Sequence, residues 1–494
     1  MLLPFTIAWL GCTDPSKTPT GDDGPTTTAP SPDATTVETA GDTASTPPET
    51  ADTAGPTPTA DSGLPTAAPA LTGDCVLTGD NALRAWCDLA VDPPAAVEVS
   101  FVAAGGTERV HPGDGEAGEH RVGLYFLPPD TDVHWEARTV DAPGPQAVLQ
   151  GVFRTDPLPV EAQADITRSG SWTVEHYLHV GPCESHNVAL VTRSSDGEVL
   201  WYQAFEPGRF VALHHTEDDT VVGVSGDRFL QEFDWMGQPL LTVEEPASSG
   251  IALHHDVFRS DGVTYTLTYE YGWVGGEQLR FDGLVGYDQQ GDEVVRWWLA
   301  DAHVPTGPHP RHGADISHAN AIFVRDGVAL VSFRHLSMVA AVVVAPGIEQ
   351  GDLLWTLEGY PAESFVGSTF ELYDLDGTRA TFQQQHDVRW LANGRLSLYD
   401  NGIPDDRLSR GLEIDLDFST FEATVVQQYV LDAHCGFQGG SARTEAGDAV
   451  LTCGPEQRAV VFAAGTDAVV WGSTYTCPDE GDTRVLPRLV PLDL

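Results

Sequence analysis

Between residues 73 and 157, apolar and polar residues alternate in short runs that are separated by Gly, Pro and Asp. The runs are VEVSFVA (97–103), RVGLYFL (121–127), VHWEARTV (133–140) and AVLQGVFRT (147–155). Alternation with a period of two is typical of strands with one buried face, and the turn residues separate one strand from the next. We therefore predict an all-β sandwich for this part of the chain.

The string YFLPPDTDVHWEARTVDAPG (125–144) resembles the fibronectin type III and related modules, in which Pro-x-Thr precedes a strand that carries an aromatic residue. The resemblance implies a small immunoglobulin-like sandwich over residues 73–157. We expect this domain to serve packing or the formation of a homodimer.

From residue 158 to residue 494, strands of similar character recur, and no amphipathic helix is evident. A unit repeats in which a polar, often His-bearing start leads into an apolar strand, a turn and a second apolar strand. The copies read ESHNVALVTRSSDGEVLWYQ (184–203), ALHHTEDDTVVGV (212–224), ALHHDVFRSDGVTYTLTYE (252–270), ISHANAIFVRDGVALVSFRH (316–335), QQHDVRWLANGRLSLYDNG (384–402) and FQGGSARTEAGDAVLTCG (437–454).

These six copies predict a β-propeller of about six blades. His215, His255, His318 and His386 are spaced 40, 63 and 68 residues apart. A blade takes roughly 40 to 50 residues, so we place the surplus in surface loops. Because equivalent strand-start residues of different blades converge on one end of the central channel, we expect these side chains to form a cluster there.

The N-terminus has two segments of unusual composition. Residues 1–12, MLLPFTIAWLGC, resemble a lipoprotein signal, in which Cys12 is acylated. Residues 13–72 are rich in Thr, Pro, Ala and Asp, and they cannot bury enough apolar surface to offset the entropy of ordering. We predict a disordered tether and an exported protein anchored by its lipid to a bacterial membrane, in the periplasm or at the cell surface. The lipid is its only expected contact with the membrane.

Acidic residues outnumber basic ones by 73 to 25, which gives a formal net charge of -48. Nucleic-acid binding needs clustered Lys and Arg, so this composition argues against it. A strongly negative protein can still hold a local cationic pocket. Any anion-binding site therefore has to be found residue by residue.

Besides Cys12, the chain has six cysteines, and an even number in an exported protein favours disulfides. Six cysteines allow 15 pairings. Our hypothesis pairs neighbours in sequence and joins the start of the large domain to its end. The bonds are Cys75–Cys87, Cys435–Cys453 and Cys183–Cys477.

An ordered series of strings between about residues 160 and 480 resembles the arylsulfotransferases, PAPS-independent bacterial enzymes. The strings are GIALHHDVF, DISHANAIFV, VSFRHLSMV, LLWTLEG, TFQQQHDVRWLANGRLSLYDNG, SRGLEIDLD and GGSARTEAGDAVLTCG. His-Asp or His-x-Asn alone is a weak signal, but the order of the whole series is specific. The resemblance implies a β-sandwich before a six-bladed propeller, and a channel histidine that is transiently sulfated in a ping-pong cycle without a cofactor.

The family positions can be placed on this sequence one by one. The nucleophile falls on His386, in QHDVRWL, and the two other family histidines fall on His255, in HHDVF, and His318, in SHANA. The family arginine falls on Arg334, in SFRH. The resemblance implies that small aryl sulfates and phenols are the substrates.

Neighbouring residues complete the predicted site. We choose His255 over His254 because it stands directly before Asp256, as His386 stands before Asp387. Asn320 and Asp387 are candidates to fix the orientation of a ring, and Asp387 is also a candidate to hold the reactive tautomer of a channel histidine.

The residue types suit sulfuryl transfer, in which negative charge spreads over nonbridging oxygens and positioning does most of the work. A neutral imidazole, with an ordinary pKa of about 6.5, is a nucleophile at neutral pH. The donor fork of Arg334 can bind two sulfonate oxygens. His255 and His318 can donate to the third oxygen or exchange a proton with the phenolic oxygen.

Two other functions are open at this point. Converging histidines can bind zinc or copper, although Arg334 would repel a cation. The propeller can also be a non-catalytic module for surface binding or scaffolding. Metal analysis and a transfer assay would separate these classes. A histidine at a strand start is more often structural, and this applies to His186, His214, His215 and His335.

Overall fold

The computed structural model describes residues 68–492 except 104–107, 114–117, 141–144, 182–187, 206–209, 247–250, 306, 348–349, 360–363, 404, 406 and 478–485. The described residues belong to one compact unit, Leu64–Leu494. The signal segment with Cys12, most of the tether, Cys183 and His186 lie outside them. No helix in the described part is long and apolar enough to span a membrane.

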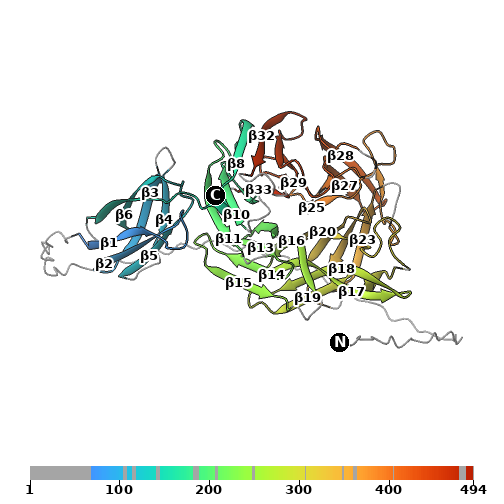
Figure 1. The fold of residues 1–494 in the computed structure, drawn as a ribbon, viewed down its shortest axis with the longest axis horizontal. Coiled ribbons are helices and arrows are strands. Elements are labelled where there is room, and N and C mark those ends of the chain that lie inside the picture. Colours follow the sequence, from blue (N-terminus) through green and yellow to red (C-terminus); the bar gives the residue numbers. More distant parts are fainter. Residues whose placement is uncertain are drawn as a thin grey trace, which may run out of the picture. The chain divides into compact units, whose positions relative to one another are not determined.

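The first seven strands form two antiparallel sheets (Figure 1). One sheet contains β1 (Ala70–Leu77), β2 (Ala85–Asp92) and β5 (Glu119–Leu124), and the other contains β4 (Arg109–Pro112), β3 (Ala96–Ala103), β6 (Asp132–Val140) and β7 (Val148–Arg154). Alternate residues of β2, β3 and β6 are buried and share one core, which includes Val99 and Trp135. The alternation in the sequence therefore does mark strands with one buried face, while the immunoglobulin-like assignment stays a prediction.

The remaining described residues are nearly all β and form a β-propeller (Figure 1). Two short helices, η1 (Val160–Ala162) and α1 (Leu299–Ala302), interrupt the strands. Within the described residues there are six sheets, and the strands of each run in order from the inner to the outer one. The first has β33 (Leu489–Leu492), β9 (His176–Val180), β10 (Val188–Arg193) and β11 (Val199–Ala204); the second has β12 (Phe210–His215), β13 (Val221–Ser225), β14 (Phe229–Phe233) and β15 (Pro239–Glu244); the third has β16 (Ala252–Ser260), β17 (Val263–Val274), β18 (Glu277–Tyr287) and β19 (Glu293–Trp298).

The next three sheets complete the series. The fourth has β20 (Ala319–Arg325), β21 (Val328–Phe333), β22 (Met338–Val343) and β23 (Leu353–Glu358); the fifth has β25 (His386–Trp390), β26 (Leu396–Asp400), β27 (Arg410–Asp417), β28 (Glu422–Val430) and β24 (Glu371–Tyr373); the sixth has β29 (Gly440–Arg443), β30 (Ala449–Cys453), β31 (Arg458–Phe462), β32 (Val469–Thr476) and β8 (Asp165–Gly170).

The inner strands contact one another in a closed series, β12, β16, β20, β25, β29, β33 and back to β12. Both ends of the domain close this ring. Strand β33 pairs with β9 in the first sheet, and β8 pairs with β32 in the last. A circular arrangement brings the starts of strands far apart in sequence to the same place.

Each sheet packs both faces against its neighbours. One core joins the third and fourth sheets around Leu267 and Phe333, and another joins the fourth and fifth around Leu357 and Leu398. Middle strands such as β22 are accordingly apolar at every position rather than at alternate ones. The continuous apolar runs in the repeats reflect this double burial.

Disulfides join Cys75 to Cys87, across β1 and β2, and Cys435 to Cys453. These are two of the three pairings expected from the sequence. Cys477 is also in a disulfide. Its expected partner, Cys183, lies outside the described residues.

Candidate active site

Three inner strands carry the predicted channel histidines and are irregular where the histidines lie. The register shifts between His254 and Val257 in β16, between Ala319 and Ala321 in β20, and between His386 and Arg389 in β25. Such bulges turn a side chain away from its ordinary direction in the sheet.

The backbone at these positions is left-handed. The φ angle is +60° at His255 and +50° at His318, and at the third position it is +51° on Asp387. Residues other than Gly adopt this region at a cost, and such residues cluster at functional sites. The repeated bulge thus gives three adjacent blades the same strained device at the end of the channel.

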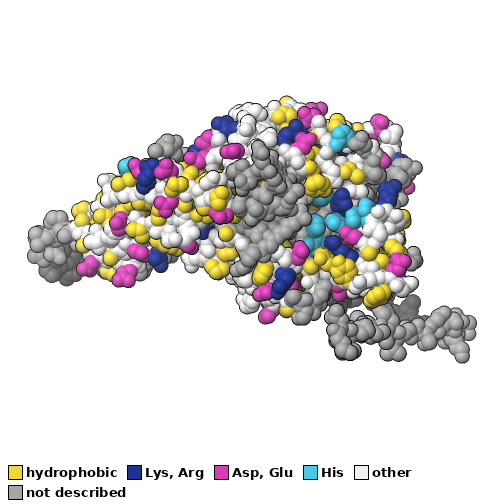
Figure 2. All heavy atoms as spheres, viewed as in Figure 1, with side chains coloured by type: hydrophobic (Ala, Val, Ile, Leu, Met, Phe, Trp, Pro, Cys, Tyr) yellow, Lys and Arg dark blue, Asp and Glu magenta, His cyan; other side chains and the backbone are white. Residues whose placement is uncertain are grey.

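His255, Asn320 and His386 line one cavity of about 480 Å³, part of which is open to solvent. The His255 and His318 rings lie 4.8 Å apart between centroids. Figure 2 shows histidine and basic side chains gathered side by side over β20 on the face in view. The rest of the cavity wall is largely apolar, and includes Leu178, Val180, Ala212, Leu213, Pro487 and Val490. A cavity with imidazoles at one side and apolar walls suits a flat, apolar substrate that carries one polar group.

His386 is 7% exposed and its orientation is fixed by Asn401. The His386 Nδ1 atom lies 2.7 Å from Asn401 Oδ1. The amide nitrogen of Asn401 donates to the carbonyl oxygens of Cys435 (2.6 Å) and Gln438 (2.8 Å), so the Asn401 oxygen is the atom that faces His386. An amide oxygen only accepts, and His386 Nδ1 must therefore carry the proton. This leaves Nε2 with a free lone pair.

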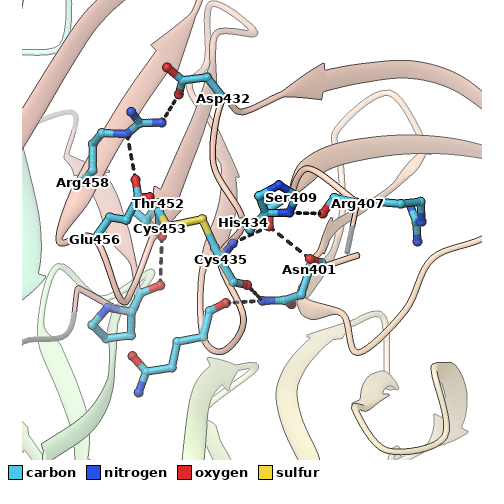
Figure 3. The surroundings of a disulfide bond; sticks show 12 residues. Asn401, Arg407, Ser409, Asp432, His434, Cys435, Thr452, Cys453, Glu456 and Arg458 are labelled. Carbon is cyan, nitrogen blue, oxygen red and sulfur yellow. Dashed lines mark hydrogen bonds and ion pairs between the residues drawn. A yellow bond between two sulfur atoms is a disulfide. The ribbon is translucent and has the colours of Figure 1, made fainter. Parts of the chain in front are cut away.

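Asn401 is held by the segment that contains the second disulfide. Figure 3 shows its side chain pointing to the Cys435 backbone, next to the bond between Cys435 and Cys453. Ser409 donates to the Asn401 carbonyl oxygen and accepts from the Cys435 amide. The disulfide thus fixes the carbonyl group that orients the partner of His386.

Electrostatics keep His386 neutral. Burial and then the positive charge of Arg334 lower its pKa to about 3, although the bond to Asn401 opposes the shift. At neutral pH the ring is therefore an unprotonated nucleophile with its lone pair on Nε2.

Arg334 follows β21 and does not line the cavity itself, but its charge acts on His386. Its backbone N–H donates to the His318 carbonyl oxygen (3.0 Å), which fixes the turn against that histidine. The guanidinium donates to His335 Nε2 (3.0 Å) and to the Gly436 carbonyl oxygen (3.4 Å). Among the described residues, no carboxylate lies within ion-pair distance of Arg334.

His318 has a carboxylate partner. Its Nδ1 donates to Asp315 Oδ2 (2.6 Å), which leaves Nε2 as the nitrogen that can meet a substrate. His335 Nδ1 donates to the Asp315 carbonyl oxygen (2.8 Å), and both its nitrogens are thus engaged. His335 has the structural role expected from the sequence, but it has that role inside the site, because it supports both Arg334 and Asp315.

The two aspartates next to channel histidines connect blades. Asp256 Oδ2 accepts from the Ile322 amide (2.8 Å), and Asp387 Oδ2 accepts from the Ser441 amide (2.6 Å). Arg488 pairs with both of them, at 3.0 Å from Asp387 Oδ1. Burial lowers the pKa of this guanidinium, but the two carboxylates outweigh that effect and raise it.

The expectation that Asp387 holds the reactive tautomer of a channel histidine is wrong. Its Oδ1 atom pairs with Arg389 and Arg488, and its Oδ2 atom caps the next blade. Asn401 takes that part for His386. Asn320 does help to place His386, because its amide donates to the carbonyl oxygen of Gln385, the preceding residue (2.8 Å).

Asp315, His318 and His335 also present ligand atoms within 4.8 Å of one another, a spacing that could hold a metal ion. Their atoms are however engaged in the hydrogen bonds just described, and the Arg280 guanidinium lies 3.5 Å from Asp315. Arg334 donates to one of the three. Two guanidinium groups beside the donors suit an anion better than a cation.

The fold and the site together define a β-propeller whose channel end combines a neutral nucleophilic imidazole with an arginine that pairs with no carboxylate of the described residues. This is an arrangement for handling an anionic group. The chain belongs to the arylsulfotransferase (ASST) family, whose model matches residues 187–434. This membership indicates an arylsulfotransferase-like function on small aryl substrates. No curated protein matches the chain at a significant level.

Similarity to solved structures is low. A protein of unknown function from Bacteroides caccae is 12% identical, with a TM-score of 0.43 and with 65% of this chain and 100% of that chain covered. A catalytically inactive virginiamycin B lyase from Staphylococcus aureus with quinupristin is 8% identical, with a TM-score of 0.37 and coverage of 67% and 100%. The WD40 β-propeller domain of Doa1 is 10% identical, with a TM-score of 0.32 and coverage of 63% and 95%.

Proposed function

We propose that the protein transfers a sulfuryl group from an aryl sulfate to a phenol through a sulfohistidine at His386. The observation that carries this proposal is an arginine, without a carboxylate partner among the described residues, beside a neutral imidazole of fixed tautomer. In a protein with 73 acidic and 25 basic residues, an arginine in a buried cluster would ordinarily be paired with an acid. A sulfonate supplies the missing partner.

In the first half of the cycle, the His386 Nε2 lone pair attacks sulfur. A nitrogen–sulfur bond forms while the bond between sulfur and the bridging phenolic oxygen breaks, and its electron pair leaves with the phenolate. Arg334 pairs with the nonbridging oxygens, whose charge it offsets. The Nδ1 proton stays on its bond to Asn401, and the sulfated ring is therefore a cation at nitrogen and an anion at its sulfonate.

In the second half, the oxygen of an acceptor phenol attacks the same sulfur from the opposite side. The nitrogen–sulfur bond breaks, and its electron pair returns to His386 Nε2. The phenolic proton has to leave during this step, and His255 and His318 are the imidazoles within reach of the site. The apolar wall of the cavity holds the aryl ring of either substrate.

Intact-mass analysis after incubation with a chromogenic aryl sulfate tests the proposal. We expect the wild-type protein to gain one SO3 group and to lose it when phenol is added. His386→Ala should gain none. His134→Ala, which removes an exposed histidine from β6 in the sandwich, should behave as wild type. Turnover without any gain of SO3 would contradict a sulfohistidine intermediate.

We also propose that the reaction takes place outside the cytoplasm, with the folded unit tethered through residues 13–72 to an acylated Cys12. The composition of these segments supports this proposal. Labelling with a fatty acid that is lost in Cys12→Ser would test it.

A further inference from the structure

A series of buried polar groups leads from the channel into the protein behind His255. The His255 Nδ1 atom lies 2.7 Å from the Nδ1 atom of His254, and the two rings are nearly perpendicular. His254 is 2% exposed, and its Nε2 faces Asp282 Oδ1 at 3.4 Å. Asp282 is completely buried. Two histidines of β16 and an aspartate of β18 thus lie in line between the cavity and the interior.

The contacts of Asp282 show that it is ionised. It accepts from Ser317 Oγ (2.6 Å) and from the His318 amide (2.9 Å), and it pairs with Arg280 at 3.0 Å. Burial raises the pKa of this carboxyl, but His254 and Arg280 outweigh burial and lower it below its ordinary value. A buried carboxylate in this setting has only acceptor atoms to offer to His254.

The proton positions follow along the series. Since Asp282 only accepts, the Nε2 atom of His254 carries a proton. Burial lowers the pKa of His254, and the neutral ring then has a bare Nδ1. The 2.7 Å contact therefore has His255 Nδ1–H as the donor. The Nε2 atom of His255 is left bare on the ring that lines the cavity with His386.

We propose that His255, His254 and Asp282 form a proton relay that deprotonates the phenolic acceptor. This inference rests on the function proposed above. The acceptor O–H bond breaks and its proton goes to His255 Nε2, while the phenolic oxygen forms its bond to sulfur and the nitrogen–sulfur bond at His386 breaks. His255 passes its Nδ1 proton to His254 Nδ1, and the positive charge comes to lie beside Asp282.

The relay solves an electrostatic problem of this site. A positive charge held on His255 itself would lie next to His318, whose ring centroid is 4.8 Å away, and close to Arg280. Burial, His254 and His318 all lower the pKa of His255 and so oppose protonation there. Moving the charge to His254 places it 3.4 Å from a carboxylate instead. In the next cycle the same path returns the proton to the departing phenolate.

His254→Asn is the decisive variant. The Asn Oδ1 atom can replace His Nδ1 as the acceptor for His255, so the ring stays in position, but it cannot take a proton onward. We expect transfer to a phenol with a pKa of about 10 to fall about 100-fold, within the range of general base catalysis. Transfer to nitrophenols that are already ionised at the assay pH should change little, because they carry no proton to remove.

Asp282→Asn should give the same dependence on acceptor pKa, although it also disturbs the His318 amide. His215→Asn is the matched control. It lies in the same tetrapeptide, ALHH, of the preceding repeat and contacts the exposed Asp219 at 2.9 Å. We expect it to transfer to both kinds of acceptor at the wild-type rate, and thermal unfolding should confirm that all three variants are folded.

Failure of the relay is distinguishable from failure of the sulfohistidine. If wild-type protein gains no SO3 group, the proposed function and the relay both fall. If wild type and His254→Asn both gain it, and both pass it to weakly acidic phenols at equal rates, the relay alone is wrong. A loss in His254→Asn that is equal for ionised and un-ionised acceptors would also overturn the relay, because it would show a structural role only.

Discussion

Two arginines flank the channel histidines, and their surroundings are opposite. Arg488 is held between the carboxylates of Asp256 and Asp387, each of which also caps the inner strand of the next blade. Arg334 donates to one imidazole and one carbonyl oxygen, and no carboxylate of the described residues pairs with it. The first arginine has its charge fully offset within the fold, while the second keeps a charge for a ligand.

The difference shows how a strongly acidic protein can bind an anion. Arg488 directly precedes β33, the strand that closes the ring, and its two ion pairs tie that closure to the third and fifth blades. Arg334 lies in a turn that is fixed by backbone bonds to the His318 segment. Scaffold and binding functions are thus assigned to different cations within one cluster.

Removing the arginine that keeps its charge for a ligand should have the largest effect. In Arg334→Met we expect kcat/KM for transfer between a chromogenic aryl sulfate and phenol to fall about 1000-fold, the cost of losing a donor to a developing oxyanion. Arg334→Lys should lie between the two, because it keeps the charge but not the fork. A wild-type rate in Arg334→Met would show that this guanidinium does not bind the sulfuryl group.

Removing the paired arginine should instead unfold the protein more easily. Arg488→Met leaves two buried carboxylates without their shared partner, and we expect the free energy of unfolding to drop by about 3 to 5 kcal/mol. Arg458→Met, which breaks a surface pair with the exposed Asp432, should cost less than about 1 kcal/mol. Denaturant unfolding measures all three proteins. Equal destabilisation by Arg334→Met and Arg488→Met would erase the contrast between the two arginines.

The sequence was sufficient for the propeller and for the channel histidines. His255, His318 and His386 each precede an apolar strand in a repeated string, and a circular fold brings such positions together. Their partners carry no such signal. The tetrapeptide ALHH occurs at 212–215 and at 252–255, yet His215 contacts the exposed Asp219 and His254 the buried Asp282.

The supporting residues come from other strands or from the far end of the chain, which is why the sequence did not reveal them. Asp282 is on the third strand of its sheet, and Arg488 lies 102 residues after His386. Asn401 stands in SLYDNG, inside the most specific family string, but nothing in that string shows that its amide faces His386. Only the ring geometry relates these positions to one another.

Loss of the disulfide beside the site should be the third largest effect. Cys435 and Cys453 are 18 residues apart, and replacing both with Ser should lower the free energy of unfolding by about 3 kcal/mol. Because the Cys435 carbonyl holds Asn401, we also expect kcat to fall at temperatures where the variant is folded. The matched pair, Cys75→Ser with Cys87→Ser in the sandwich, should change stability but leave kcat unaltered.

Asn401→Ala removes the acceptor for His386 Nδ1 without removing charge. We expect kcat to fall about 10-fold to 100-fold, as for other partners that fix an imidazole tautomer. The extent of SO3 incorporation at long times should be preserved, since the nucleophile is still present. A smaller loss than that of His134→Ala would show that the tautomer is fixed by other means.

The acid limit of the first half-reaction would separate the effect of Arg334 on His386 from its effect on substrate. The pKa of His386 is about 3, so in wild type SO3 incorporation should stay constant from neutral pH down to about pH 4. Arg334 is the second cause of that low pKa, after burial, and in Arg334→Met the pKa should rise and the acid limb should move to higher pH. His386 also affects stability. Its folded pKa lies below the unfolded value of about 6.5, and its contribution to stability is therefore full above pH 6.5 and is lost progressively as the pH falls toward 3. Stopped-flow release of the chromophore, combined with thermal unfolding at each pH, measures both limbs. An unchanged acid limb in Arg334→Met would mean that its charge does not reach His386, and Arg334 would then act on the substrate alone.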